Sequence, residues 1–294
     1  MRDAGVKIGI IGDGVVGGAL GAWFESQRVD VRSYDPPKGL RDRTVIDRAD
    51  VVFVCVPTPY VAERGFDHSY LLEAMASISG SKLVVIKSTV LPGTTDELQR
   101  RYPQHRFMFN PEFLREATAV DDMAHPDRQI AGVTPESEDE AAMALALLPP
   151  APFVRVCPAR EAEMAKYVAN SFLAIKVSFA NEVFDLCERT GIDYDGVRDI
   201  VAADERIGAS HFDVLADGYR GYGGKCLPKD SKALLDLAAI AGVEMDVLAA
   251  ADATNARMIA GPAHIGVTRK SRVAIESDDA SEAPARVHAR SIGR

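Results

Sequence analysis

Two short glycine-rich segments carry residue types whose spacing could do chemistry. The first reads Gly12-x-Gly14-x-x-Gly17 and lies between an apolar run and a helical pattern. Gly12 would permit a tight turn, Gly14 would let the backbone approach a pyrophosphate, and Gly17 would let a helix pack closely on a strand. The amides of Val15 and Val16 would begin that helix and face the phosphates. The pattern predicts a dinucleotide site.

An acidic residue follows this motif at the distance that nucleotide recognition requires. Asp35 lies 21 residues beyond Gly14, at the end of the second apolar run. Its carboxylate can accept hydrogen bonds from both ribose hydroxyls, and its charge repels a 2′-phosphate. We therefore expect NAD, rather than NADP, as the cofactor. The alternative is that the glycines serve only close packing and that Asp35 caps a strand end.

The second segment, GYGGKCLPKD at residues 221–230, places one cysteine in a shaped loop. Cys226 lies just ahead of a helical pattern and is flanked by Lys225 and Lys229. Thiols at helix N-termini and beside cations become more nucleophilic because the thiolate is stabilised. The loop therefore predicts a reactive thiol. The alternative is a buried structural thiol, which is our interpretation of the cysteines in mid-strand and mid-helix positions.

The elements that must position these loops alternate along the first half of the chain. Short apolar runs separated by helical patterns predict an α/β protein with a Rossmann-like, doubly wound parallel sheet. Some of the runs are apolar almost throughout, which fits strands covered on both faces. Strands are expected at 6–12, 29–35, 51–56, 82–89, 106–110, 128–133 and 153–158, and helices at 15–26, 68–79, 94–101 and 136–148.

After Pro158 the pattern is helical. Residues 161–190 contain neither glycine nor proline and stop at Gly191, and a helix of that length spans about 45 Å. Apolar residues on more than one side of this helix predict a second subunit as its cover. These residues are Met164, Val168, Phe172, Ile175, Phe179, Val183 and Leu186. Shorter helices are expected at 193–203, 229–241 and 246–260, with a glycine-containing loop from 204 to 225.

The length of 294 residues fits two domains. We expect an NAD-binding domain over residues 1–158 and an all-helical dimerisation domain over residues 159–264. Residues 265–294 carry few large apolar side chains, too few to offset the entropy of ordering them, which predicts a disordered tail.

Composition excludes several classes of function. The net charge of −9 argues against a nucleic-acid-binding face. No run of 18 apolar residues occurs, which argues against a membrane span. Four scattered cysteines and six histidines form neither a disulfide framework nor a metal-ligand pattern. We expect a reduced, cytoplasmic protein without a metal.

Seven blocks of the chain, in this order, resemble those of one known family. They are GIIGDGVVG (9–17), VVFVCVPTP (51–59), KSTVLPGTT (87–95), NPEFLREATAVDD (110–122), KYVANSFLAIKVSFANE (166–182), DERIG (204–208) and GYGGKCLPKD (221–230). The combination of NPEFLRE with GYGGKCLPKD is highly specific, and the resemblance covers roughly residues 6–260. The chain is similar to the UDP-glucose/GDP-mannose dehydrogenase family.

The resemblance implies that a primary alcohol is oxidised twice, with two NAD and no metal. Cys226 would capture the intermediate aldehyde as a thiohemiacetal, and a second hydride transfer would give a thioester that water hydrolyses. The substrate expected first is UDP-glucose, which would become UDP-glucuronate. GDP-mannose and UDP-N-acetylmannosamine remain open.

The resemblance also implies roles for residues outside the cysteine loop. Lys166 and Asn170 share one face of the long helix and would stabilise the developing alkoxide and oxyanion. Glu116 would assist thioester hydrolysis and would also lie near the cofactor. Asp230 would activate a water or orient Lys166. Thr89 would position a water beside the nicotinamide.

Further residues are implied in substrate binding, together with Lys166 and Asn170. Glu112 precedes Glu116 in the same segment. Gly223 would offer a loop amide. Arg206, in the DERIG block, would reach across a homodimer to the substrate of the partner subunit.

Members of this family have three parts, and the third is a second Rossmann-like domain that holds the nucleotide. This chain ends where that domain would begin, so we expect a natural short form, a fragment, or a chain whose partner supplies the domain. Three functions remain open. They are a two-step nucleotide-sugar dehydrogenase, a catalytically weak NAD-binding dimer, and a single-step β-hydroxyacid dehydrogenase, which does not need Cys226.

Overall fold

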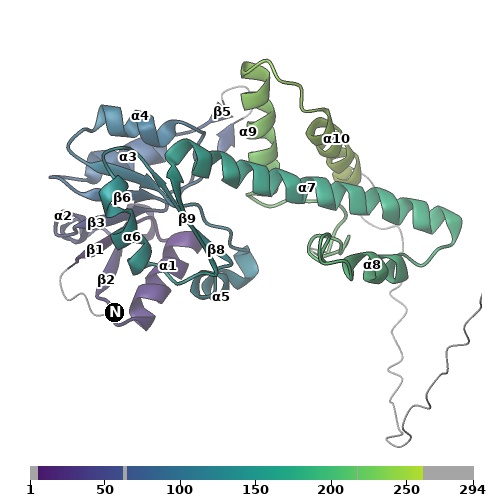
Figure 1. Ribbon diagram of the computed structural model, residues 1–294, viewed down its shortest axis with the longest axis horizontal. Coiled ribbons are helices and arrows are strands. Elements are labelled where there is room, and N and C mark those ends of the chain that lie inside the picture. The colour runs from purple at the N-terminus through teal and green to yellow at the C-terminus, as the bar shows by residue number, and fades with distance from the viewer. Residues whose placement is uncertain (1–5, 62–64, 217, 261–294) are drawn as a thin grey trace, which may run out of the picture. The chain divides into compact units, whose positions relative to one another are not determined.

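The computed structural model describes residues 6–61, 65–216 and 218–260. Strands and helices alternate through the first half, and only helices follow (Figure 1). The α/β class predicted from the sequence is confirmed. The tail predicted for residues 265–294 lies outside the described residues.

The strands are short and follow the apolar runs of the sequence. They are β1 (Ile8–Ile11), β2 (Val31–Tyr34), β3 (Val51–Val54), β4 (Tyr60–Val61), β5 (Gly65–Phe66), β6 (Leu83–Ile86), β7 (Arg106–Phe109), β8 (Arg128–Val133) and β9 (Phe153–Pro158). The helices are α1 (Val15–Ser26), α2 (Thr44–Asp47), α3 (Ser69–Ser77), α4 (Thr94–Arg101), α5 (Ala119–Ala124), α6 (Ala141–Leu147), α7 (Ala159–Thr190), α8 (Tyr194–Ala202), α9 (Leu227–Ile240) and α10 (Asp246–Ala260). Three 3₁₀ turns complete the set: η1 (Pro36–Lys38), η2 (Glu116–Thr118) and η3 (Glu138–Glu140).

Seven strands form one sheet in the order β2-β1-β3-β6-β7-β8-β9. Neighbours from β2 to β7 are parallel. β8 pairs antiparallel with β7, and β9 pairs parallel with β8, so the last two strands run in the opposite direction. The sheet is therefore mostly, not wholly, parallel. Hydrophobic periodicity indicates that a segment is a strand but does not encode its direction.

The chain reverses its winding at β1, because β2 lies on one side of this strand and β3 on the other. In doubly wound sheets the crevice at such a reversal, beyond the carboxyl ends of the strands, is where ligands bind. The glycine motif follows β1 directly and lies at this edge. The topology thus puts the predicted dinucleotide site at the reversal.

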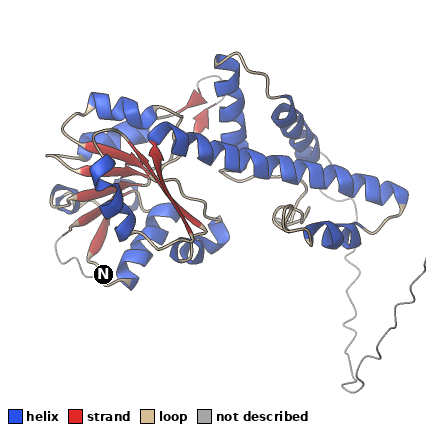
Figure 2. Ribbon diagram, in the orientation of Figure 1, coloured by secondary structure: helices blue, strands red, loops and turns tan. Residues whose placement is uncertain are grey.

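Helices cover both faces of the central strands (Figure 2). All residues of β3 and β6 are buried. Val52 and Val84 pack in a cluster with side chains from α2, α3 and α4. Phe53 packs on the other face in a cluster that includes Leu20 and Phe24 of α1. Each such side chain contributes about 1.5–3 kcal/mol when buried, which explains why these strands read as continuous apolar runs.

The long helix α7 connects the sheet to the helical half. It ends where Gly191 adopts a left-handed φ of 71°. Tyr167 is fully buried against Leu234 of α9 and Leu248 of α10, and Phe184 contacts Tyr194 of α8 edge to face. Among the helices of the described residues, none is long and apolar enough to cross a membrane.

Candidate active site

The glycine motif forms the turn between β1 and α1. Gly12 has a φ of +91°, and a Cβ there would lie 2.5 Å from the carbonyl oxygen of Cys55. A Cβ on Gly17 would overlap the carbonyl oxygen of Gly12. A Cβ on Gly14 would meet no atom within 4 Å. The first and third glycines are therefore required by packing, whereas the second leaves an open approach to the backbone.

That open approach fits the phosphates of a dinucleotide. Gly14 caps α1 without a side-chain hydrogen bond, and Val15 and Val16 line the same cavity as Gly14. The first amides of a helix have no partner within the helix and carry the positive end of its dipole. These residues would therefore hold the pyrophosphate.

Asp35 is tied to the glycine turn by its carboxylate. Oδ2 accepts a hydrogen bond from the Asp13 amide at 2.7 Å, and Oδ1 accepts one from the Lys38 amide at 3.3 Å. Lys38 also donates through Nζ to the carbonyl oxygen of Asp13. The carboxylate thus stands next to Gly14, the position that recognition of an adenosine ribose requires.

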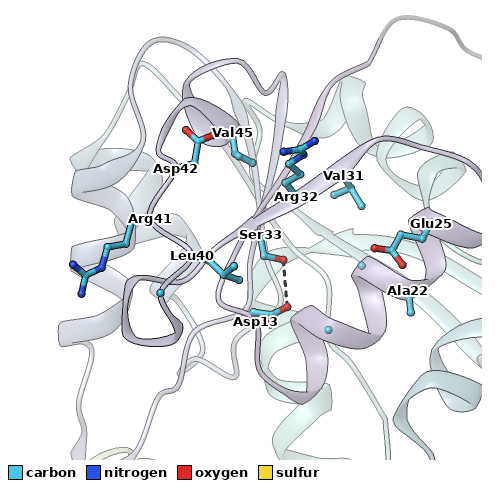
Figure 3. A pocket seen from close by; sticks show the side chains of 13 residues that line it. Asp13, Ala22, Glu25, Val31, Arg32, Ser33, Leu40, Arg41, Asp42 and Val45 are labelled. Atoms are coloured by element: carbon cyan, nitrogen blue, oxygen red, sulfur yellow. Dashed lines mark hydrogen bonds between the residues drawn. The ribbon is translucent and has the colours of Figure 1, made fainter.

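A cavity of about 690 Å³ lies along α1 and β2, beside the turn. Figure 3 shows Asp13 and Ser33 pointing toward one another across it, joined by a hydrogen bond of 3.4 Å. None of the predicted site residues lines this cavity. The predicted chemistry therefore lies elsewhere.

A second cavity, of about 590 Å³, unites residues that are far apart in the sequence, and we call it the Cys226 cavity. It extends from the glycine turn, past the segments that follow β3, β6 and β7, to the cysteine loop. The predicted residues that line it are Gly14, Val15, Val16, Thr89, Glu112, Glu116 and Cys226. Lys166, Asn170 and Asp230 are buried and are not among its lining residues.

Lys166 and Glu112 form a buried ion pair. Their side chains are 4% and 10% exposed, and Nζ lies 2.9 Å from Oε1. The same Nζ donates to the main-chain oxygen of Glu112 at 2.5 Å. Burial alone would raise the pKa of Glu112, but the Lys166 ammonium and the Leu114 amide outweigh it and hold that pKa below its ordinary value. Glu112 is thus an ionised partner that fixes Lys166.

Asp230 forms the second buried set. Asn170 donates through Nδ2 to Oδ2 at 2.5 Å, and Lys229 donates through Nζ to Oδ1 at 2.6 Å. Asp230 is 1% exposed and lies in the first turn of α9, where the helix dipole favours a carboxylate. Asp230 is expected either to activate a water or to orient Lys166. Among the described residues Lys166 Nζ contacts Glu112, and no hydrogen bond joins it to Asp230.

Cys226 caps the N-terminus of α9 and is exposed in its cavity. Desolvation raises the pKa of its thiol above the ordinary value, and the nearby Lys166 ammonium lowers it by less. The side chain of Lys225 is 84% exposed and lies 3.8 Å from Glu116. Of the two flanking lysines, Lys229 lowers this pKa, by less than Lys166 does. The cation that lowers this pKa most comes from α7.

Thr89 and Glu116 lie at different depths of the cavity. The main-chain oxygen of Thr89 accepts a hydrogen bond from Thr58 Oγ1 at 2.7 Å, which fixes the loop after β6. Glu116 begins η2 with a side chain that is 66% exposed. Both positions can reach a molecule in the cavity.

Gly223 and Arg206 are not among the residues that line the Cys226 cavity. A Cβ on Gly223 would lie 2.4 Å from the hydroxyl of Tyr219, at the far end of an exposed side chain. The side chain of Arg206 is 89% exposed and pairs with Asp204 at 2.6 Å. Their roles in substrate binding stay predictions.

Sequence reasoning gave no role to two buried ionisable residues near the site. Lys87 is 4% exposed and lines the Cys226 cavity. Glu163 is fully buried and lies one helical turn before Lys166. Lys87 ends an apolar run, and its place at the carboxyl end of a buried strand was a signal that could have found it.

Two models of one family match the chain. The UDP-glucose/GDP-mannose dehydrogenase family, NAD binding domain, matches residues 40–147, and the central domain of that family matches residues 160–257. The glycine turn and Asp35 precede these matches, so their roles depend on the geometry above. A UDP-glucose 6-dehydrogenase of Pseudomonas aeruginosa is 41% identical over 230 residues, which are 71% of this chain and 49% of that protein. The chain thus spans about half the length of this curated relative.

Solved structures agree with these matches. A UDP-glucose dehydrogenase from Pyrobaculum islandicum has a TM-score of 0.76 and 30% identity, over 87% of this chain and 69% of that one. A 3-hydroxyisobutyrate dehydrogenase of Mycobacterium tuberculosis has a TM-score of 0.69 at 20% identity, over 88% of this chain and 95% of that one. This second likeness shows the fold alone.

The fold and the glycine turn define a chain in which a Rossmann-like region with a nucleotide-type glycine turn precedes a helical region. The chain belongs to the UDP-glucose/GDP-mannose dehydrogenase family. The expectation of NAD as cofactor is confirmed by the match to the NAD-binding domain.

Proposed function

We propose that the chain is an NAD-dependent 6-dehydrogenase of nucleotide sugars that oxidises UDP-glucose to UDP-glucuronate in two steps at Cys226. One observation carries most of the support. A single cavity opens onto the Gly14 turn, where a pyrophosphate fits, and onto the thiol of Cys226, with Thr89 and Glu112 in its wall. Family membership supports the same activity.

In the first oxidation the C6 carbon loses a hydride and its hydroxyl group loses a proton. The bound dinucleotide supplies the acceptor for the hydride. The proton leaves to a water held at Thr89 in the cavity wall. Negative charge that develops on the substrate oxygen is stabilised by the Lys166 ammonium, which its buried pair with Glu112 fixes in place.

The thiol then captures the aldehyde. The Cys226 sulfur forms a bond to C6 while the carbonyl π electrons move to oxygen, and the thiol proton is transferred to that oxygen. The resulting thiohemiacetal keeps the hydrogen on C6 that leaves as the second hydride, for which a second NAD would be the acceptor. Its hydroxyl loses a proton to water at the same time, and the product is a thioester. Covalent capture is needed because the aldehyde must stay in the site until the second oxidation.

Water completes the reaction at the thioester. It adds to the carbonyl carbon, the carbon–sulfur bond breaks, and the uronate and the free thiol remain. Glu116, exposed at the cavity, is the carboxylate that takes the proton from this water. Asp230 supports the reaction through Asn170, which it holds by a hydrogen bond.

The ratio of NADH released to UDP-glucose consumed tests the proposal. We expect two NADH per UDP-glucose for the unmodified chain, and NAD binding without uronate formation for Cys226→Ala. Cys187→Ser, in a helix away from the cavity, is the control and should keep the ratio of two. One NADH per small β-hydroxyacid would instead assign a single-step dehydrogenase. NAD binding without oxidation of either substrate would assign a non-catalytic NAD-binding protein.

A further inference from the structure

Two buried lysines lie at opposite ends of β6. Lys82 precedes the strand and donates through Nζ to the main-chain oxygens of Asp47 at 2.9 Å and Ala49 at 2.6 Å. Lys87 follows the strand and donates to Oδ1 of Asn110. The two lysines are 6% and 4% exposed, but of the pair only Lys87 lines the Cys226 cavity. Because burial of an ammonium is costly, a lysine at this edge requires a reason.

Lys87 fixes the start of the segment that carries Glu112. Its acceptor, Asn110, follows β7 and donates through Nδ2 to the main-chain oxygen of Ile130 at 2.7 Å and to Oε1 of Gln129 at 3.2 Å. Asn110 therefore joins the ends of β6 and β7 to β8. A single proline separates Asn110 from Glu112, and proline restricts the backbone between them. A fixed Asn110 thus fixes Glu112.

Glu112 in turn holds Lys166 with both its carboxylate and its main-chain oxygen. The contacts form a relay from Lys87 through Asn110 and Glu112 to Lys166. Two lysines and one carboxylate share this buried region. Burial lowers the pKa of Lys87, and the carboxylate of Glu112 opposes that effect. Lys166 is also the group that most lowers the pKa of the Cys226 thiol against the effect of burial.

We propose that Lys87 is a positioning residue of the active site. Through Asn110 and Glu112 it holds the Lys166 ammonium near Cys226. Negative charge on the sulfur, or on the substrate oxygen beside it, is thereby stabilised. The inference depends on the proposed function for the identity of the reaction, but charge on the sulfur can be measured without turnover.

The test is the rate at which iodoacetamide alkylates Cys226 as the pH is raised, located by peptide mass spectrometry. The charged groups that act on this thiol are Lys166 of α7, Glu112 of the segment after β7, and Asp230 and Lys229 of α9. Lys87→Met removes the donor to Asn110 and so frees the relay. We expect alkylation at neutral pH to slow roughly three- to tenfold, with the profile displaced to higher pH.

Lys82→Met is the matched control, because it removes a buried lysine from the other end of the same strand. It should leave the alkylation profile of Cys226 unchanged. Asn110→Ala interrupts the relay while Lys87 remains. Because both residues act through one relay, alkylation of Cys226 in the double variant Lys87→Met/Asn110→Ala should be as fast as in Lys87→Met to within about twofold. Lys87→Arg keeps the charge and should restore most of the rate.

A wild-type profile in Lys87→Met, an equal change in Lys82→Met, or independent effects of Lys87 and Asn110 would each overturn the inference. Asn110→Ser retains a polar group but loses the contact with Lys87, and its profile carries the same comparison with Lys82→Met if Lys87→Met does not fold. A displaced thiol profile in a chain that oxidises no UDP-glucose would keep the inference and refute the proposed function. Two NADH per UDP-glucose in the wild type, together with an undisplaced alkylation profile in Lys87→Met, would keep the proposed function and refute the inference.

Discussion

The buried carboxylates around the Cys226 cavity each have a cationic partner. Glu112 faces Lys166, and Asp230 faces Lys229 as well as the amide of Asn170. Removal of one member of a buried charged pair costs far more than the pair contributes, since the remaining charge is left unpaired. These residues therefore fix geometry at the site more than they add stability.

Asp35 governs the choice of cofactor at the scale of a single residue. Asp35→Asn removes the charge that repels a 2′-phosphate and weakens the hydrogen bonds offered to a ribose. We expect NAD to bind roughly 10- to 100-fold more weakly, a loss of about 1.5–3 kcal/mol, and the preference over NADP to narrow. Calorimetric titration with both cofactors measures this.

Asp30→Asn is the control for the cofactor prediction. Asp30 lies five residues earlier, with a side chain that is 93% exposed, and should leave both affinities unchanged. NAD affinity equal to wild type in Asp35→Asn would remove Asp35 from the site.

The residues that the sequence predicted at the site have local signatures, whereas the roles of those that it missed depend on contacts made in the fold. Gly12, Gly14 and Gly17 each have a distinct backbone requirement, which their spacing encodes. Lys87 acts through Asn110, a contact between two strands that are neighbours only in the fold. The raised pKa of Cys226 has a similar cause, because burial depends on elements from the whole chain.

At the scale of elements, Glu163 joins the long helix to the sheet. It accepts hydrogen bonds from the Gly93 amide at 2.5 Å, the Thr95 amide at 2.8 Å and Thr95 Oγ1 at 2.6 Å. These groups begin α4, whose own cap, Gly93, has no side chain. Glu163 is therefore the cap of a helix from another part of the chain, and it sets the register of α7 against the loop that carries Thr89.

Glu163→Ala should destabilise the protein by about 2–4 kcal/mol, because two buried donors of Thr95 and the part-buried Gly93 amide lose their acceptor. Unfolding by urea, followed by circular dichroism, measures this. Glu161→Ala, at an exposed position of the same helix, should change stability by less than about 0.5 kcal/mol. Equal stability of the two variants would show that Glu163 does not join the two elements.

The carboxyl group of Glu163 also makes the stability of the protein depend on pH, and its contribution decreases as the pH rises. Burial raises the pKa of Glu163 above its ordinary value of 4.5, so the folded state binds this proton more tightly than the unfolded state does. Its contribution to stability therefore falls as the pH rises from 4.5 toward the raised pKa. Glu163→Gln, which does not titrate, should lack that decline. If the stability of Glu163→Gln fell with rising pH as steeply as that of the wild type, the pH dependence would belong to another group.

Elements with long regular patterns could be predicted closely, and short ones could not. The helices expected at 15–26 and 161–190 are found at Val15–Ser26 and Ala159–Thr190. The hairpin of β4 and β5 was missed because two-residue strands have no periodicity. The opposite direction of β8 was also missed, because tertiary pairing decides it.

At the scale of the whole molecule, α7 presents a row of exposed apolar side chains. Five large ones are 36–61% exposed, and they recur at intervals of four or seven residues, which puts them along one side of the helix. They are Met164, Val168, Phe172, Phe179 and Leu186. An uncovered row of this length supports the homodimer expected from the sequence.

Phe172→Asp combined with Phe179→Asp should convert a dimer to a monomer, since two charges would have to be buried in the interface. Analytical ultracentrifugation should give twice the chain mass for the wild type and the chain mass for the variant. Val247→Asp, on the exposed side of α10 and 69% exposed in the wild type, is the control and should stay dimeric. A wild-type monomer at micromolar concentration would contradict the dimer.

The central claim is that Cys226 holds the sugar covalently between two oxidations, and one measurement tests it directly. The Cys226→Ser variant is incubated with NAD and UDP-glucose, and the reaction is quenched in acid. The protein is then digested, and the masses of its peptides are measured by mass spectrometry. An oxygen at this position can still add to the aldehyde, and the ester formed by the second oxidation is hydrolysed more slowly without the sulfur as leaving group. The account predicts a sugar ester on the peptide that contains position 226, and no adduct in Cys187→Ser. Uronate formation by Cys226→Ser at the wild-type rate, with no adduct at position 226, would contradict it.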